Sequence, residues 1–266
     1  MTSPAVPSGR PTAKGSGPFT LGVDIGGSHI KVSVLDSGGG LMAEEVRLPT
    51  PEPATPQDVV AIIAKLAAGL PAFDRISVGF PGVVKGGAVL TAPNLGTEYW
   101  AGFKLLSALK QRLRVPARML NDAAVQGLGA VDGDGVGCIL TLGTGVGCAL
   151  FRDRRFLLHL ELGQHIARRG KTYDEYLGQA ALVARGKEKW NKRLAKCIGW
   201  ATQLTSCDTL YLGGGNARKI TVELPAHVKV VSNSAGITGG VRLWERDLDR
   251  LFAGVPAAQR TDEANE

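Results

Sequence analysis

Four segments of this chain contain the residue types that bind phosphate and move a proton. The first, DIGGSHIK at residues 24–31, sets a carboxylate at the end of an apolar run, before two glycines, a serine and a lysine. Glycines let the backbone N–H groups of a tight turn approach an anion, and Ser28 and Lys31 add a hydroxyl and a positive charge. An ordinary β-hairpin turn that follows an aspartate has the same composition. This segment alone therefore fits either a phosphate-binding turn or a structural hairpin.

Two further glycine turns have the same character. LTLGTGVG, residues 140–147, is a second glycine hairpin, and its N–H groups and the Thr144 hydroxyl are suited to another phosphate. YLGGGNA, residues 211–217, follows an apolar run, and its glycines permit a nucleotide or phosphate chain to approach a helix N-terminus. The predicted phosphate-binding residues are Asp24, Gly26, Gly27, Ser28, Lys31, Gly143, Thr144, Gly145, Gly213, Gly214 and Gly215.

The fourth segment, MLNDAAVQG at residues 119–127, contains a candidate general base. Asn121 and Asp122 stand where a predicted strand ends and a helix begins. The helix N-terminus helps to keep Asp122 ionised, so that it can accept a proton from a substrate hydroxyl. An ordinary N-cap aspartate fits the same position. This segment alone therefore does not distinguish a general base from a helix cap, and the interpretation depends on the other three segments.

The elements that must position these residues alternate between β and α patterns. Three short runs joined by tight turns, at residues 19–49, predict a β-meander. A Thr-Pro start and apolar residues at 59, 62, 63, 66 and 70 predict a helix over residues 55–70. The other predicted strands cover residues 75–80, 117–121, 136–151 (two strands), 208–213 and the start of 228–248, and the other predicted helices cover residues 103–113, 122–131, 172–186, 187–206 and 236–253.

A meander followed by helix and strand units occurs twice, once from Phe19 and again in reduced form from Gly135. This duplication predicts an α/β fold of two lobes with a cleft between them, and the glycine turns face each other across it. The predicted division is a disordered tail at residues 1–18, a small N-terminal lobe at 19–120 with a returning helix at 236–253, a larger C-terminal lobe at 121–235, and a loose tail at 254–266.

Composition narrows the function classes. No run approaches the roughly 20 apolar residues of a membrane helix, and the Pro-, Gly- and Ser-rich start lacks the apolar core of a signal peptide, so we expect a cytoplasmic protein. Four cysteines without CxxC or CxC spacing, in apolar surroundings, predict buried reduced thiols. A net charge of +7 fits either a solvated basic surface or a polyanionic partner.

Taken in this order, the four segments resemble the ROK family of sugar kinases in the actin/hexokinase/Hsp70 superfamily. The resemblance extends from Leu21 to about Leu251 and is strongest to the polyphosphate-dependent and dual-donor glucokinases. It implies an actin-like ATPase fold, with a ribonuclease-H-like core in each lobe. It also implies a homodimer, Mg²⁺, and either ATP or inorganic polyphosphate as phosphoryl donor.

The resemblance also implies residue roles. Asp24 would hold Mg²⁺ through water, and Asp122 would deprotonate the sugar hydroxyl. Glu161 falls in the Glu-x-Gly-His sugar motif of the family, where this chain has Gln164 in place of the histidine. Glutamine still donates and accepts hydrogen bonds, and His165 is an alternative if the loop shifts. The predicted sugar-binding residues are Gly82, Asn94, Asn121, Asp122, Glu161 and Gln164.

Besides Gln164, two missing features of the family bear on function. No cysteine lies between Cys148 and Cys197, so the cysteine-rich zinc motif of many ROK proteins is missing and we expect no zinc. The chain has no N-terminal helix-turn-helix segment and few aromatic residues, so we expect no nucleic-acid partner.

Three further patterns suggest other sites. Gly170-Lys171-Thr172 ends like a P-loop, but the glycine that the signature needs is His165; we interpret Thr172 and Glu175 as a helix capping box instead. His159, Glu161 and His165 follow no familiar metal-ligand spacing. The basic run at residues 185–196 is interpreted as a solvated helix face, with a rail for polyphosphate as the alternative.

The function expected from these observations is phosphoryl transfer from polyphosphate or ATP to the 6-hydroxyl of a hexose, with glucose as the first candidate. The alternatives are a strictly ATP-dependent gluco- or mannokinase, and a sugar-binding sensor whose catalysis Gln164 has weakened. The partners expected are a small-molecule sugar and a phosphoryl donor, with no nucleic acid and no membrane.

Overall fold

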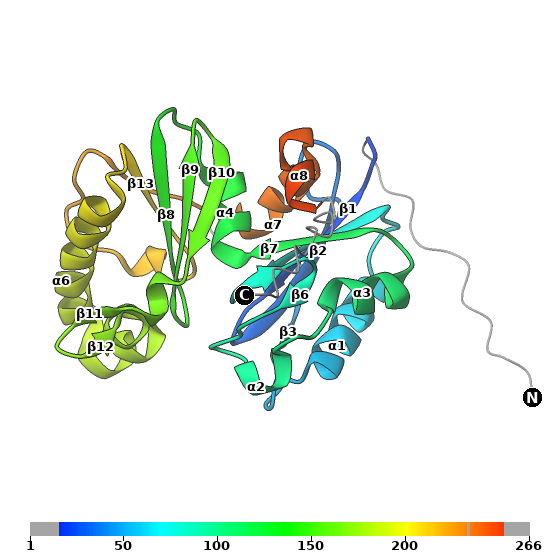
Figure 1. Ribbon diagram of the computed structural model, residues 1–266, viewed down its shortest axis with the longest axis horizontal. Helices are drawn as coiled ribbons and strands as arrows, with labels where there is room; N and C mark the ends of the chain where they lie inside the picture. The colour runs from blue at the N-terminus through cyan, green and yellow to red at the C-terminus, as the bar shows by residue number, and fades with distance from the viewer. Residues whose placement is uncertain (1–15, 233–234, 253–266) are drawn as a thin grey trace, which may run out of the picture.

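The computed structural model describes residues 16–232 and 235–252, which form two five-stranded sheets. The first has the order β3-β2-β1-β4-β7 and the second the order β10-β9-β8-β13-β14, so each is an antiparallel meander extended by two parallel strands. The sheets lie in separate halves of the molecule (Figure 1). The duplicated α/β unit predicted from the sequence is thus present, with the same strand order in both copies.

The bounds of these strands follow the sequence pattern closely. In the first sheet they are β1 Thr20–Ile25, β2 His29–Leu35, β3 Val46–Pro49, β4 Arg75–Phe80 and β7 Ala117–Asn121. In the second sheet they are β8 Val136–Leu142, β9 Val146–Arg152, β10 Arg155–Leu160, β13 Thr209–Gly213 and β14 Val228–Val230. A small hairpin of β5 Val84–Lys85 and β6 Ala88–Val89 follows β4.

Helices α1 (Pro56–Ala68) and α3 (Leu105–Leu113) cover the outer side of the first sheet, as Figure 1 shows. Thr55 caps α1 by accepting a hydrogen bond from the Asp58 N–H, and a proline opens the helix, as predicted. The short α2 (Thr97–Trp100) ends in a fully buried tryptophan, whose indole N–H donates to the Ala54 carbonyl over 2.8 Å. These elements and the sheet share one apolar core.

Helix α4 (Asp122–Ala130) lies between the sheets and packs against elements of both. Residues 123–128 are all buried. The sequence suggested an aspartate cap at this helix, but the N-cap residue is Asn121, whose Oδ1 accepts from the N–H groups of Ala123 and Ala124. Asp122 is therefore the first helical residue, and its side chain is not needed as the cap.

The second sheet is covered by α5 (Tyr173–Leu177) and α6 (Gln179–Thr205), the latter at the far left of Figure 1. Gly186, at a φ of +77°, interrupts α6 where the sequence predicted one helix to end and the next to begin. The prediction of one helix over residues 172–186 is wrong, because Gly178 breaks it. A Cβ on Gly178 would lie 2.5 Å from the Thr144 carbonyl oxygen, so the chain passes too close to the 143–145 turn to remain helical there.

The C-terminal segment returns to the first lobe, but the single helix predicted for residues 236–253 is wrong. The chain instead forms short turns: α7 Ala235–Thr238, η3 Gly239–Trp244, η4 Arg246–Leu248 and α8 Asp249–Phe252. Two adjacent glycines weaken a helix here, and Gly239 packs directly on the carbonyl of Val125 in α4, where no side chain fits. Trp244 fixes the segment to the first sheet by donating to the Ser77 hydroxyl, 2.9 Å away.

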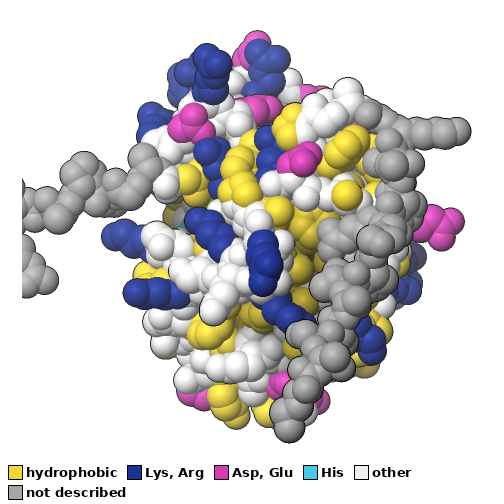
Figure 2. All heavy atoms as spheres, turned by 90° about the vertical axis from the view of Figure 1, so that its right-hand side faces the viewer, with side chains coloured by type: hydrophobic (Ala, Val, Ile, Leu, Met, Phe, Trp, Pro, Cys, Tyr) yellow, Lys and Arg dark blue, Asp and Glu magenta, His cyan; other side chains and the backbone are white. Residues whose placement is uncertain are grey.

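The tails predicted at residues 1–18 and 254–266 lie outside the described residues, apart from residues 16–18. All four cysteines are free and buried, as predicted. No helix in the described part of the chain has both the length and the apolarity needed to span a bilayer. Figure 2 views the molecule from the right-hand side of Figure 1, and on that face Lys and Arg side chains are spread among apolar and acidic ones.

Candidate active site

A cavity of about 570 Å³ separates the two lobes, and both contribute to its walls. Of the residues predicted from the sequence to bind substrates, all except Gly213 line it. They come from strand ends, from the turns after β1 and β8, from the start of α4, and from the loops after β4, β10 and β13. The fold thus brings segments as far apart as residues 24 and 215 to one cleft.

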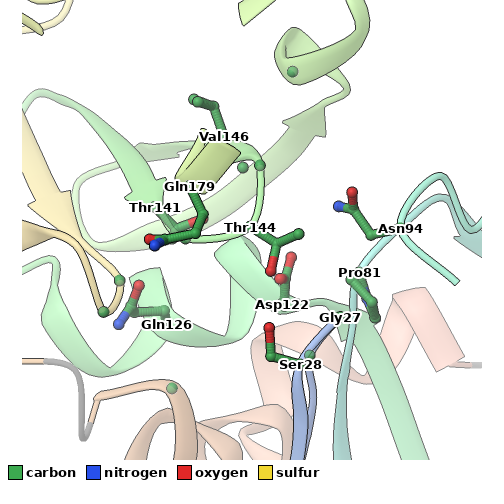
Figure 3. Close-up of a pocket in the computed structure, with 18 of the residues that line it drawn as sticks. Gly27, Ser28, Pro81, Asn94, Asp122, Gln126, Thr141, Thr144, Val146 and Gln179 are labelled. Atoms are coloured by element: carbon green, nitrogen blue, oxygen red, sulfur yellow. The ribbon is translucent and has the colours of Figure 1, made fainter. Parts of the chain in front are cut away.

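The two predicted phosphate turns face each other across this cleft. A Cβ built on Gly27, in the β1–β2 turn, would lie 3.3 Å from the Thr144 hydroxyl oxygen in the β8–β9 turn. Figure 3 shows Gly27 and Ser28 on one side of the cavity and Thr144 on the other. An anion between the turns would meet backbone and hydroxyl donors from both lobes.

Asp122 lies in the middle of the cleft, at the positive end of α4. Its Oδ1 accepts from the Ala123 N–H over 2.8 Å. The pKa of Asp122 is raised to about 7, first by burial and then by the negative charges of Asp24 and, more weakly, Glu161, while the Ala123 hydrogen bond acts in the opposite direction. This carboxylate is therefore poised to take up a proton near neutral pH.

A row of charged side chains crosses the first sheet beside Asp122. Asp24 on β1 pairs in register with Lys31 on β2, and Lys31 pairs with Arg47 on β3. The Lys31 ammonium lies 3.2 Å from Asp24 Oδ2, and all three residues line the cleft. The row carries one carboxylate close to the candidate base and two cations farther from it.

The other end of the cleft has the polar groups predicted to bind a sugar. Asn94 and Pro81 lie together at this end in Figure 3. Gly82 packs against the Thr91 carbonyl too closely for any side chain. The Asn121 amide reaches the Gly82 carbonyl over 3.3 Å and caps α4, so its hydrogen bonds in this structure go to backbone groups. Burial, followed by the charge of Asp174, raises the pKa of Glu161.

Gln164 contacts a carboxylate that the sequence analysis did not single out. Its Nε2 donates to Asp174 Oδ2 over 2.9 Å, while Asp174 Oδ1 accepts from the Val146 N–H over 2.7 Å. Burial raises the pKa of Asp174, and these two hydrogen bonds act in the opposite direction. Asp174 therefore ties the loop of Glu161 and Gln164 to the first residue after the second phosphate turn.

Residues 20–160 match the sequence model of the ROK family, which spans more than half of the chain. The chain belongs to the ROK family. It is 31% identical over 272 residues to a polyphosphate glucokinase of Mycobacterium leprae, covering 93% of this chain and 80% of that protein. It is 30% identical over 239 residues to a polyphosphate glucokinase of Mycobacterium tuberculosis, covering 82% of this chain and 88% of that protein.

Among solved structures, the chain is similar to the inorganic polyphosphate/ATP-glucomannokinase of Arthrobacter sp. strain KM. The TM-score is 0.77 at 29% identity, and the match covers 85% of this chain and 98% of that one. The two-lobed fold that the sequence predicted is thereby confirmed.

In this ROK protein the loop after β13 differs from the expectation. The glycines do not open a helix: Gly214 adopts a φ of +82°, and only the short 3-10 turn η2 (Ala217–Lys219) follows. Gly213 is buried at the strand end and does not line the cleft, whereas Gly214 and Gly215 do. Asn216 ties this loop to the second phosphate turn, because its amide donates to the Gly143 carbonyl over 3.1 Å.

The patterns that suggested other sites have structural explanations. Thr172 caps α5, and with Glu175 it forms the predicted capping box. His159 Nε2 lies 3.7 Å from Glu161 Oε1, but residues 16–232 and 235–252 contain no group of three or more His, Cys, Asp or Glu side chains that could hold a metal ion. The basic run at residues 185–196 lies on α6, and none of its residues lines the cleft.

Several cleft residues escaped the sequence analysis, namely Arg47, Gln126, Thr141, Asp174, Gln179 and Arg218. A signal for Asp174 was available, since the capping box uses Thr172 and Glu175 and leaves the carboxylate between them without a role. The others carry no local pattern, because what brings them to the cleft is the pairing of distant strands.

Proposed function

We propose that this ROK protein is a sugar kinase that transfers a phosphoryl group from inorganic polyphosphate or ATP to the 6-hydroxyl of glucose. The observation that supports this most directly is the position of Asp122, which lies between two facing glycine turns and a polar end of the same cleft. The names of the relatives support the same reaction, since they are a polyphosphate glucokinase and a polyphosphate/ATP-glucomannokinase.

In this proposal Asp122 accepts the proton of the sugar 6-hydroxyl as the oxygen attacks the terminal phosphorus of the donor. One P–O bond forms to the sugar and one breaks to the bridging oxygen, so the products are a sugar 6-phosphate and a donor shortened by one phosphate. The Gly26 and Gly143 N–H groups donate within their own turns. The transferring group is therefore held by the remaining N–H groups of the two turns, those of Gly27, Ser28, Thr144 and Gly145. Phosphoryl transfer needs little more than such positioning and charge stabilisation.

The residues present are compatible with one Mg²⁺ ion. Mg²⁺ is usually held by one or two carboxylates together with substrate phosphates and water, and Asp24 offers one carboxylate at the cleft beside the β1–β2 turn. When bound, the ion would neutralise charge on the donor phosphates. Asp24, through water, is the ligand that we propose.

The position of Gln164 does not favour the sensor alternative. Gln164 lines the cleft and donates a hydrogen bond to Asp174, which lines it too, so the glutamine makes a polar contact within the site in place of the family histidine. The homodimer that the family resemblance implies and the cytoplasmic location expected from the composition belong to the same proposal.

The test of this function is a steady-state matrix of two donors against several sugars. Glucose with polyphosphate or ATP is expected to give hexose 6-phosphate in a coupled assay, and mannose serves as the second sugar. Turnover with ATP alone would establish the strictly ATP-dependent alternative. Tight sugar binding without turnover of any hexose by either donor would establish the sensor.

The pH dependence of the reaction follows from Asp122. Only its ionised form accepts a proton, so kcat/KM for the sugar is expected to rise with pH along a limb whose apparent pKa lies near the value of about 7. Burial is the main cause of the raised pKa, and the charge of Asp24 adds to it; Asp24→Asn removes that second contribution, so the limb is expected to move to lower pH. Because kcat/KM reports the free enzyme, the shift can be measured even where Asp24→Asn lowers the rate. If the apparent pKa of kcat/KM is the same in Asp24→Asn and in the wild type, the charge of Asp24 does not affect the pKa of Asp122.

Donor choice is expected to depend on the cations at the cleft. Arg47 and Arg218 are exposed residues on opposite walls, and each extra phosphate unit of a long donor brings further charge toward them. Arg47→Gln is expected to lower kcat/KM for polyphosphate about 3- to 10-fold at low ionic strength, and less at high salt. The same variant is expected to lower kcat/KM for ATP by less than it lowers kcat/KM for polyphosphate. Arg112→Gln on α3, which does not line the cleft, is the matched control.

A further inference from the structure

Gln126 is a buried amide without a hydrogen-bond partner in the described structure. Its side chain belongs to the small set of buried polar residues, and it is only 4% exposed. The other six members of that set all make side-chain hydrogen bonds, whereas none involves the Gln126 side chain. The six are Thr20, Ser33, Ser77, Asn121, Asn191 and Asn216.

The side-chain amide of Gln126 faces the cleft. Gln126 lines the cavity, and Figure 3 shows it together with Thr141 and Gln179 at the end opposite Asn94 and Pro81. None of the side-chain nitrogen or oxygen atoms that are sealed from solvent in the described structure lacks a partner, so the Gln126 amide must reach the open space of the cavity. The group is thus placed to meet a ligand rather than left buried in the core.

The position of Gln126 on α4 indicates which ligand it meets. It follows Asp122 by four residues, so both side chains project from the same side of the helix, about 6 Å apart along its axis. From the candidate base, Gln126 lies toward the loop after β13. A donor whose terminal phosphate sits between the glycine turns would extend in this direction.

Gly213 provides the room for this side chain. A Cβ on Gly213 would lie 2.5 Å from Gln126 Oε1, and the three atoms nearest to it all belong to the Gln126 amide. Gly213 adopts no left-handed φ, so its backbone alone does not require glycine. The absence of a side chain at position 213 is explained by the amide beside it.

We propose that Gln126 is a donor-binding residue, whose Nε2 donates a hydrogen bond to a phosphate oxygen of the unit behind the transferred one. Phosphate oxygens accept but do not donate at neutral pH, and a primary amide has two N–H donors. The Gln126 amide faces the open cavity, so a phosphate bound there can accept a hydrogen bond from it. This inference rests on the proposed function, because it takes the ligand at this end to be the phosphoryl donor.

The direct test measures binding of inorganic tripolyphosphate and of ATP by titration calorimetry, and the KM of each donor. Gln126→Met keeps the length of the side chain and removes its donors. It is expected to raise the donor Kd and KM about 10- to 100-fold, the range for a hydrogen bond to a charged group, with the glucose Kd unchanged. Gln111→Met on the exposed face of α3 is the matched control and is expected to change neither.

A double-mutant cycle keeps the inference testable if Gln126→Met fails to fold. Gly213→Ala displaces the amide and is expected to weaken donor binding about 10-fold, whereas in a Gln126→Ala background the same change meets no amide and is expected to cost nothing more. Equal donor affinity in wild type and Gln126→Met, or additive effects in the cycle, would overturn the role of Gln126 alone. A wild-type protein that binds neither donor and turns over no hexose would overturn the proposed function as well.

Discussion

Asp122→Asn is expected to lower kcat about 10²- to 10⁴-fold, the contribution typical of a positioned general base. Asparagine keeps the shape of the side chain and an oxygen that can accept from the Ala123 N–H, which lies 2.8 Å from Asp122 Oδ1. What it loses is the ability to take up the proton of the sugar hydroxyl. The glucose Kd, measured by calorimetry, is expected to stay close to that of the wild type, so the effect falls on the rate and not on binding.

The stability of the same variant provides its control. The folded pKa of Asp122, about 7, lies above the ordinary value of 3.8, so the native state loses stability as pH rises between these values. Above that window asparagine carries no such penalty, and Tm at pH 8 is expected to equal or exceed that of the wild type. A variant that is stable, binds glucose and still turns over at the wild-type rate would show that Asp122 is not the base.

Asp174→Ala is expected to lower kcat/KM about 10- to 100-fold, because it removes two hydrogen bonds to a charged group. One of them fixes the Val146 N–H beside the second phosphate turn and the other holds the Gln164 amide. Without the carboxylate, the loop of Glu161 and Gln164 is no longer tied to the turn at residues 143–145. Both the sugar KM and the donor KM are therefore expected to rise, which a contact with only one substrate would not produce.

Glu175→Ala is the matched control, since Glu175 follows Asp174 directly but serves only the capping box of α5. It is expected to lower Tm slightly without changing kcat/KM. Gln164→His tests whether the loop of Glu161 and Gln164 contacts the sugar. If it does, this change is expected to alter the sugar affinity or the rate. An Asp174→Ala variant with unaltered KM for both substrates would contradict the proposed tie.

The strands and glycine turns of this protein could be predicted because their signals are local. The runs at residues 75–80 and 117–121 coincide with β4 and β7, and the two glycine hairpins join β1 to β2 and β8 to β9. Alternation and tight-turn chemistry depend on neighbouring residues alone. The two lobes and the facing turns follow from the repeated order of these elements.

What could not be predicted depends on contacts between distant segments. The C-terminal helix is replaced by short turns because Gly239 meets the backbone of α4, more than 100 residues earlier. Asp174 reaches Val146 across 28 residues, and the amide of Gln126 on α4 lies beside Gly213 at the end of β13. The sequence could not decide between a cap and a base at Asp122, because Asn and Asp are equally good caps and only the backbone geometry shows that Asn121 is the cap.

The measurement that tests the account most directly is phosphorus NMR of the full-length protein with glucose, Mg²⁺ and inorganic tripolyphosphate or ATP, repeated with Asp122→Asn. The proposed function predicts that the signal of a sugar 6-phosphate grows as the terminal phosphate signal of the donor declines, and that Asp122→Asn suppresses both changes. Absence of a sugar phosphate with either donor, from a protein that binds glucose tightly, would contradict it.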